Sequence, residues 1–234
     1  MTIGATASYT RGGSSAATWD TGTITAPSDG DLVYIYIHSN GASGFTIDAA
    51  GSTWETAILN AAAASEGAYH AIYWKVAGAS EPTSYSGTGA SAEYRSITKV
   101  TAGGGTGWEI DASLSQSRTT SKFTSMISEA QNGATVSSNS ISFITSGKDR
   151  RGGTALAYTT ADNSYTGVVG NRLYQNTAGA HRVFAPGQTI SVDVTITPVD
   201  ASDNIFSTHV SFIESGGSPA SIIPQITQQY YRNN

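Results

Sequence analysis

The stretch HAIYWKVAGASEPTSY concentrates side chains that could form a binding or catalytic site. It holds two aromatic rings, Tyr73 and Trp74, next to the amine of Lys75, and the carboxylate of Glu81 follows in the loop GASEP. Successive side chains of a β-strand point to opposite faces, so Tyr73 and Lys75 share one face and Trp74 lies on the other. Trp74 and Lys75 therefore cannot converge on one ligand. We interpret the stretch as a strand, a hairpin loop and a second strand that together serve as scaffold.

The chain contains no sequence motif that indicates a hydrolase active site. A serine hydrolase of the α/β type needs a G-x-S-x-G turn, which is absent. A glycosidase needs two carboxylates that face each other across a cleft. The chain offers acidic residues without a spacing that selects a pair: Asp48, Glu55, Glu66, Glu81, Glu93, Glu109 and Asp111. We predict that the protein is not an enzyme.

The four histidines, His38, His70, His181 and His209, lack the spacing of metal ligands. His38 and His70 lie at the ends of apolar segments, where a hydrogen-bonded structural imidazole is the common outcome. His209 lies among polar residues and is expected to face outward. The segment DASDN (200–204) alternates oxygen ligands but lacks the glycine and glutamate of a calcium loop, so it is predicted to be a turn. No metal and no cofactor are predicted.

Composition narrows the range of partners. Charged residues make up 12% of the 234 residues, about half the usual share, and the net charge is -5 with no basic stripe. Nucleic acid is therefore not an expected partner. The chain has no cysteine, so disulfides and thiolate ligands are excluded. It shows neither an apolar run of membrane-spanning length nor a signal-peptide pattern, and no membrane contact is expected.

Short apolar segments bounded by Gly, Ser, Asp and Pro predict many strands. Residues 31–38 are apolar on both faces, which is typical of a central strand, and 71–77 follow the same pattern. Residues 189–200 and 204–214 alternate, which indicates half-buried strands. The alanine-rich segment 53–68 is the best helix candidate, but its irregular spacing favours a loop with at most a helical turn. Further strands are expected near 21–25, 45–47, 83–88, 93–101, 123–127, 140–145 and 154–159.

A weak internal repeat points to a duplication. GDLVYIYIHSNGASG (30–44) resembles SNSISFITSGKDRRGG (138–153) in arrangement, and each is followed by two later strands. Two such halves would build one sandwich, because neither could cover both faces of its own sheet. We predict an all-β fold, a two-sheet antiparallel, jelly-roll-like β-sandwich over residues 14–214. Extended arms are expected at residues 1–13 and 215–234.

Two segments are candidates for contact with a partner. The last twenty residues place isolated apolar side chains in a background rich in Gln and Asn, which favours an arm that docks on a neighbouring subunit over a free tail. GKDRRGG (147–153) is the only charge cluster, and either a solvated loop tip or a partner-facing one fits it. The predicted partner-binding residues are Tyr9, Lys148, Arg150, Arg151, Ile222, Ile223, Ile226, Tyr230 and Tyr231.

Four segments, DGDLVYIYIHSNG, Trp54, YWKVAGASEP and STHVSFIE, carry a resemblance. Together they resemble a β-sandwich domain of virion proteins of tailed bacteriophages and of some bacterial surface proteins. That family tends to have Pro-Pro-x-Gly-Trp where this chain has DAAGSTW (48–54). The resemblance implies a structural or attachment module of a phage particle, not a catalyst.

The expected function is that of a non-enzymatic virion structural protein. A capsid decoration (cement) protein is favoured, bound to the major capsid protein or to other virion proteins as a homo-oligomer, expected to be a trimer. It would be located in the virion, assembled in the host cytoplasm. The first alternative is a tail or fibre component that binds a host-surface glycan through Trp54 and Trp108, which glycine-rich loops flank. An unrecognised glycan-processing enzyme is the least favoured alternative.

Overall fold

The computed structural model describes residues 3–11, 17–40, 44–48, 53–62, 68–89, 92–111, 116–120, 126–129, 135–148, 157–160, 166–167, 177–189, 193–197 and 205–216. Within these ranges all regular secondary structure is β-strand, and every pair of neighbouring strands is antiparallel. The predicted all-β antiparallel sandwich is thereby confirmed.

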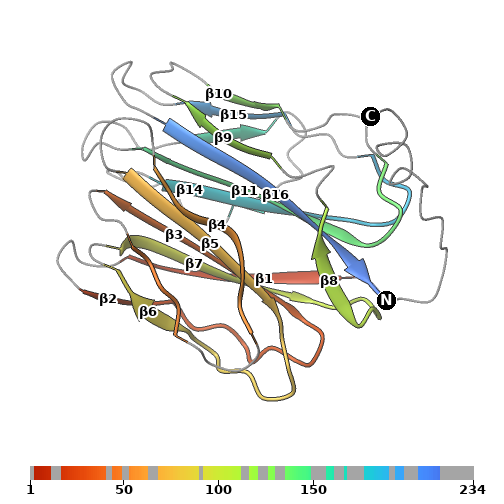
Figure 1. Ribbon diagram of the computed structural model, residues 1–234. Helices are drawn as coiled ribbons and strands as arrows, with labels where there is room; N and C mark the ends of the chain where they lie inside the picture. The colour runs from red at the N-terminus through yellow and green to blue at the C-terminus, as the bar shows by residue number, and fades with distance from the viewer. Residues whose placement is uncertain are drawn as a thin grey trace, which may run out of the picture.

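The first half of the chain builds a five-stranded sheet, called sheet A, in the order β1-β7-β3-β5-β4 (Figure 1). A two-stranded sheet B lies on its outer side. The strands of sheet A are β1 (Gly4–Arg11), β3 (Leu32–Asn40), β4 (Glu55–Ala62), β5 (Ala68–Val76) and β7 (Ala92–Thr101). Those of sheet B are β2 (Thr18–Asp20) and β6 (Ser86–Thr88).

The second half builds sheet C in the order β13-β14-β11-β16-β8, with β9 also paired to β16, and a smaller sheet D in the order β10-β15-β12. From bottom to top of Figure 1 the sheets follow in the order B, A, C and D. The strands of sheet C are β8 (Gly107–Ile110), β9 (Gln116–Thr120), β11 (Ser140–Lys148), β13 (Thr166–Gly167), β14 (Thr177–Phe184) and β16 (Ile205–Ser215). Those of sheet D are β10 (Met126–Glu129), β12 (Ala157–Thr160) and β15 (Asp193–Thr197).

The two halves share one strand topology. The order β1-β7-β3-β5-β4 of sheet A matches β8-β16-β11-β14-β13 of sheet C, and the matching strands follow one another in the same sequence order in each half. In each half the second of these strands, β3 or β11, lies at the centre of its sheet. These two strands coincide with the repeated segments in the sequence. The topology supports an internal duplication of a sheet-building unit.

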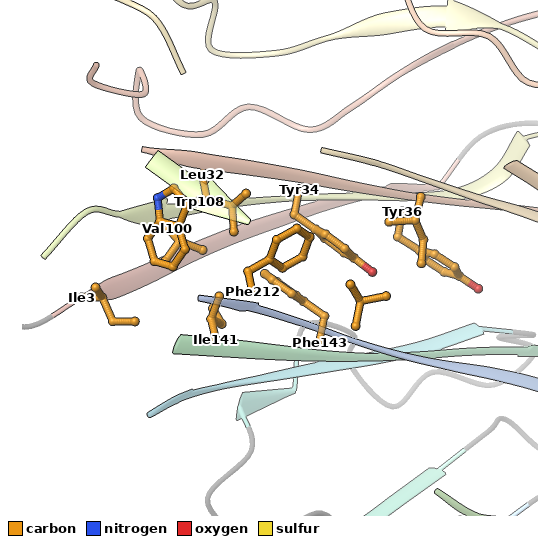
Figure 2. Close-up of a cluster of buried hydrophobic side chains, with 11 residues drawn as sticks. Ile3, Leu32, Tyr34, Tyr36, Val100, Trp108, Ile141, Phe143 and Phe212 are labelled. Carbon is orange, nitrogen blue, oxygen red and sulfur yellow. The ribbon is translucent and has the colours of Figure 1, made fainter. Parts of the chain in front are cut away.

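The main hydrophobic core lies between sheets A and C (Figure 2). Tyr34 on β3 and Phe143 on β11 occupy matching places and stack face to face, with ring centroids 3.9 Å apart and planes 6° apart. Phe212 packs edge-on against both rings, at 6.0 Å and 5.9 Å. Because equivalent residues meet, the contact between the halves is that of a pseudo-symmetric dimer within one chain. The other buried residues of this main core are Ile3, Leu32, Tyr36, Ile72, Val100, Trp108, Ile141 and Val210.

A second core covers the other face of sheet A. Trp19 on β2 is buried, and its indole N–H donates to the carbonyls of Thr46 and Thr88 at 3.1 and 3.0 Å. Sheet A is thus covered on both faces, which explains the two-sided apolar pattern of residues 31–38. The prediction of a central strand there is confirmed, since β3 pairs with β5 and β7. The other buried members of this core are Ile24, Val33, Ile35, Ile37, Phe45, Ala71, Tyr73, Ala77, Tyr85 and Ile97.

Three predictions of local structure were wrong. Within the expected arm at residues 1–13, Gly4–Arg11 form strand β1 instead, because their backbone pairs with β7 over all eight residues and Ile3 enters the main core. The segment 53–68, expected to be a loop, contains β4, whose pairing with β5 shifts register twice. Residues 21–25 and 45–47 are not strands but loops, tied by backbone hydrogen bonds such as Thr21 N–H to the Tyr85 carbonyl.

Candidate functional site

Lys75 and Glu81 meet on the outer face of sheet A. Both side chains are fully buried, and the amine of Lys75 lies 2.5 Å from Oε2 of Glu81. The amine also lies 4.5 Å from the ring centroid of Trp54 and 4.7 Å from that of Tyr85, so the ammonium is flanked by two aromatic rings. Both contacts have the geometry of cation–π interactions.

The carboxylate of Glu81 is saturated with hydrogen bonds. Its Oε1 accepts the backbone N–H of Gly78 at 3.0 Å, and its Oε2 accepts the hydroxyl of Tyr85 at 2.9 Å. Burial raises the pKa of Tyr85 most, and the hydrogen bond with Glu81 and the negative charge of that residue raise it further. The phenol therefore stays protonated as the donor. The side chains of Lys75, Glu81, Tyr85 and Trp54 contact one another and hold the loop between β5 and β6.

The second half repeats this loop with Gln188 in the place of Glu81. The backbone N–H of Ala185 donates to Oε1 of Gln188 at 2.7 Å, three residues later, as Gly78 donates to Glu81. Arg182 precedes Ala185 by three residues, as Lys75 precedes Gly78, and its guanidinium lies 4.6 Å from the ring centroid of Phe184. The shared geometry indicates that the acidic or amide side chain caps the loop. The contacts of Glu81 near Lys75 are thus one version of a loop-capping arrangement that occurs in both halves.

The sequence prediction for this stretch was half right. Trp74 does lie on the opposite face from Lys75, where it packs edge-on against Phe212 at 5.2 Å between sheets A and C. However, the alternation rule did not reveal that Glu81 turns back onto Lys75. The partner of Lys75 comes from the loop after the strand, which strand periodicity does not describe.

The histidines form the polar part of the interior. His38 and His70 lie directly opposite each other on β3 and β5, and both side chains are buried. Nε2 of His70 lies 3.4 Å from the hydroxyl of Thr208 on β16, in the facing sheet. Burial, and secondly the neighbouring His38, lower the pKa of His70 to about 3. Burial also lowers the pKa of His181, whose ring lies 6.2 Å from Phe143. The imidazoles of His70 and His181 are therefore neutral at physiological pH.

The prediction that His209 faces outward was wrong. His209 is 3% exposed because β16 is an inner strand of sheet C, between β11 on one side and β8 and β9 on the other. Its Nε2 lies 3.2 Å from the hydroxyl of Ser211, which in turn lies 2.6 Å from the hydroxyl of Ser142. Burial lowers the pKa of His209 to about 4, which makes it a weak base. This serine–histidine contact is buried and serves packing.

A further polar contact joins the two halves, and sequence reasoning missed it. Glu214 at the end of β16 accepts the backbone N–H groups of Gly103 and Gly105, at 2.6 and 2.7 Å, through Oε1. Its Oε2 accepts the side-chain amide of Asn139 at 2.6 Å. A Cβ at Gly105 would lie 2.4 Å from the Glu214 side chain, so glycine is required there. The glycine run at 103–105 is the sequence signal from which this close approach could have been predicted.

The two tryptophans proposed as glycan contacts do not form a platform. Trp108 is 4% exposed, and its indole N–H donates to the Gly30 carbonyl at 3.0 Å. It lies in the main core, which corrects the expectation of a sugar-stacking ring. Trp54 is half-buried, and its ring contacts Lys75 and, at 5.0 Å, Tyr85.

Replacing Trp54 by leucine is expected to lower the free energy of unfolding by about 1–2 kcal/mol. Leucine keeps apolar cover over Lys75 but removes the ring that faces its ammonium. Urea unfolding followed by circular dichroism measures the change. Trp54→Phe is the matched control, because a smaller ring remains and the loss should be smaller. An equal loss of unfolding free energy in both variants would show that the cation–π contact is not the source of the stability lost in Trp54→Leu.

The predicted partner-binding residues are largely beyond what the structure describes. Tyr9 lies in β1 of sheet A and Lys148 ends β11 of sheet C, so the two are on different sheets. The turn predicted at 200–204 also lies outside the described residues. So do Arg150, Arg151, Ile222, Ile223, Ile226, Tyr230 and Tyr231.

Comparison with known proteins returned nothing: no family model matches the chain, and neither a curated protein nor a solved structure does. Among the described residues, no group of three or more His, Cys, Asp or Glu side chains is placed to hold a metal ion. The described residues also contain no helix that is long and apolar enough to cross a membrane.

Proposed function

We propose that the protein is a non-enzymatic structural component of a tailed-phage virion, a capsid decoration (cement) protein that binds virion proteins as a homo-oligomer. One observation supports this best: the charged side chains of Lys75, Glu81 and Glu214, which could serve catalysis elsewhere, form structural contacts inside the protein. Lys75 and Glu81 neutralise each other inside one loop, and Glu214 ties the two halves together. This use of charge suits a rigid building block.

The duplicated architecture also supports an adhesive role. Two halves of one topology pack against each other through sheets A and C, and the smaller sheets B and D lie on the outside (Figure 1). The molecule therefore offers neighbours two outer layers on opposite sides. A block that contacts neighbours on two sides can bridge them, and several weak contacts at once give strong attachment.

The C-terminal segment would add anchors to this block. Its isolated apolar residues, Ile222, Ile223 and Ile226, stand in a polar background and follow Ser215, where the last strand ends. Such residues gain most when they are buried in a groove of another protein. In this proposal the sandwich supplies rigidity and the segment supplies attachment to the capsid.

Deleting residues 216–234 is expected to leave the sandwich folded but to abolish incorporation into particles. The deletion begins after β16, so the strand pairs of sheet C are kept. Circular dichroism checks the fold, and copy number per purified particle checks incorporation. A truncated protein that still occupies the particle fully would contradict the role of this segment.

Point variants separate apolar anchoring from mere length. The triple variant Ile222→Ser, Ile223→Ser and Ile226→Ser should lower the copy number to near that of the deletion. The matched control replaces three neighbouring glutamines by serine and should incorporate normally: Gln225, Gln228 and Gln229. Equal incorporation of both triple variants would contradict apolar anchoring.

A further inference from the structure

Strand β1 is a long, regular edge strand. It pairs with β7 from Gly4 to Arg11 in unbroken register, and no described strand pairs with its other side. Gly4, Thr6 and Ala7 are exposed, and the strand carries one charged residue, Arg11, at its end. An edge of this kind presents a row of backbone N–H and C=O groups that can pair with another chain.

The other edges of sheets A and C, as far as the structure describes them, are irregular or short. The opposite edge of sheet A, β4, is irregular, with two register shifts against β5. In sheet C one edge strand, β13, has only two residues. At the other edge, which corresponds to β1, the described strands β8 and β9 have only four and five residues. Bulges and short strands are the devices by which proteins prevent edge pairing, and β1 has neither.

We propose that β1 pairs antiparallel with β1 of a second copy of this chain. A twofold axis perpendicular to the sheet places one residue of each β1 opposite its own copy. If that residue is Ala7, Gly4 of one copy lies opposite Thr10 of the other, and the paired segment runs from residue 4 to residue 10. Thr6 then faces Ser8, and Arg11 falls beyond the paired segment, opposite Ile3. No charged residue faces its own copy in this register, and the exposed side chains at its centre are small.

Two five-stranded sheets would thereby join into one continuous sheet of ten strands. Each copy would gain partners for the outer backbone groups of β1, about six to eight hydrogen bonds in all. Edge pairing alone forms a small interface, so the dimer is expected to dissociate in the micromolar range. This inference does not depend on the proposed function, and it replaces the expected trimer by a twofold pair.

The test is the mass of the full chain across the micromolar range, by light scattering or sedimentation. The wild type should approach twice the chain mass of 24.2 kDa. Ala7→Lys should weaken the dimer at least about tenfold, because like charges then face each other across the pair. Ala7→Glu should do the same. An equimolar mixture of the two variants should recover the dimer, because the introduced charges are then opposite.

Two controls separate pairing from folding and from charge alone. Thr56→Lys adds the same charge at an exposed position of the bulged edge strand β4 and should leave the dimer intact. Ala7→Thr adds an uncharged strand-forming residue and should also leave it intact. A wild type that keeps the mass of one chain throughout would overturn the proposal. So would an oligomer whose mass Ala7→Lys does not change.

Discussion

Replacing Glu81 by alanine is expected to lower the free energy of unfolding by about 3–5 kcal/mol. The substitution leaves the fully buried ammonium of Lys75 without its carboxylate, and it also removes the acceptor for the Gly78 N–H. An uncompensated buried charge is among the most costly defects in a protein interior. Urea unfolding at neutral pH measures the loss.

The second half of the chain supplies the matched control. Gln188→Ala removes the equivalent loop acceptor, but Gln188 is exposed and carries no charge, so the loss should be about 0.5–1.5 kcal/mol. The double variant Lys75→Met with Glu81→Gln imitates a loop capped by an amide and should recover most of the stability lost in Glu81→Ala. A loss below about 1 kcal/mol for Glu81→Ala would contradict the closed ion pair.

Acidification is expected to unfold the protein between about pH 6 and pH 4. His70 and His209 have folded-state pKa values lowered to about 3 and about 4, and the pKa of His181 is lowered as well. Below an ordinary pKa of about 6.5 the unfolded chain binds a proton at each of them while the folded chain does not, so stability falls as pH falls. Each histidine contributes about 1.4 kcal/mol per pH unit, down to its own folded-state pKa.

The slope of stability against pH tests this assignment. Unfolding free energies at a series of pH values should show a slope smaller by about 1.4 kcal/mol per pH unit in His209→Gln than in the wild type. Thr208→Val disturbs the neighbouring residue without removing a titrating group and should lower stability without changing the slope. An unchanged slope in His209→Gln would show that this imidazole titrates normally.

The two predictions concern opposite uses of polar groups in one interior. Lys75 forms an ion pair with a carboxylate, and its amine lies against two aromatic rings. His70 is kept neutral because burial, and secondly the neighbouring His38, lower its pKa. The first arrangement joins strand β5 to the loop that follows it, whereas the second makes the contact between sheets A and C sensitive to acid.

Alternation and composition determined the fold class before the tertiary structure was known. Residues 31–38 are apolar on both faces because two cores cover β3, one on each side of sheet A. The repeat between 30–44 and 138–153 marks the two central strands, β3 and β11. These features are local, since a side chain's face depends only on its parity within the strand.

Only the tertiary structure decided which segments become neighbours. The segment GATASYTR has few large apolar residues and was expected to be part of an arm, yet it is a strand because β7 offers it a paired backbone. Glu81 meets Lys75, and Glu214 meets Gly103 and Gly105, through turns and long-range pairing that no strand period encodes. Sequence alone thus determined the fold class and the two central strands, but not that the segments of β1 and β4 would be strands. Their partners were fixed by backbone hydrogen bonding and by packing between distant segments.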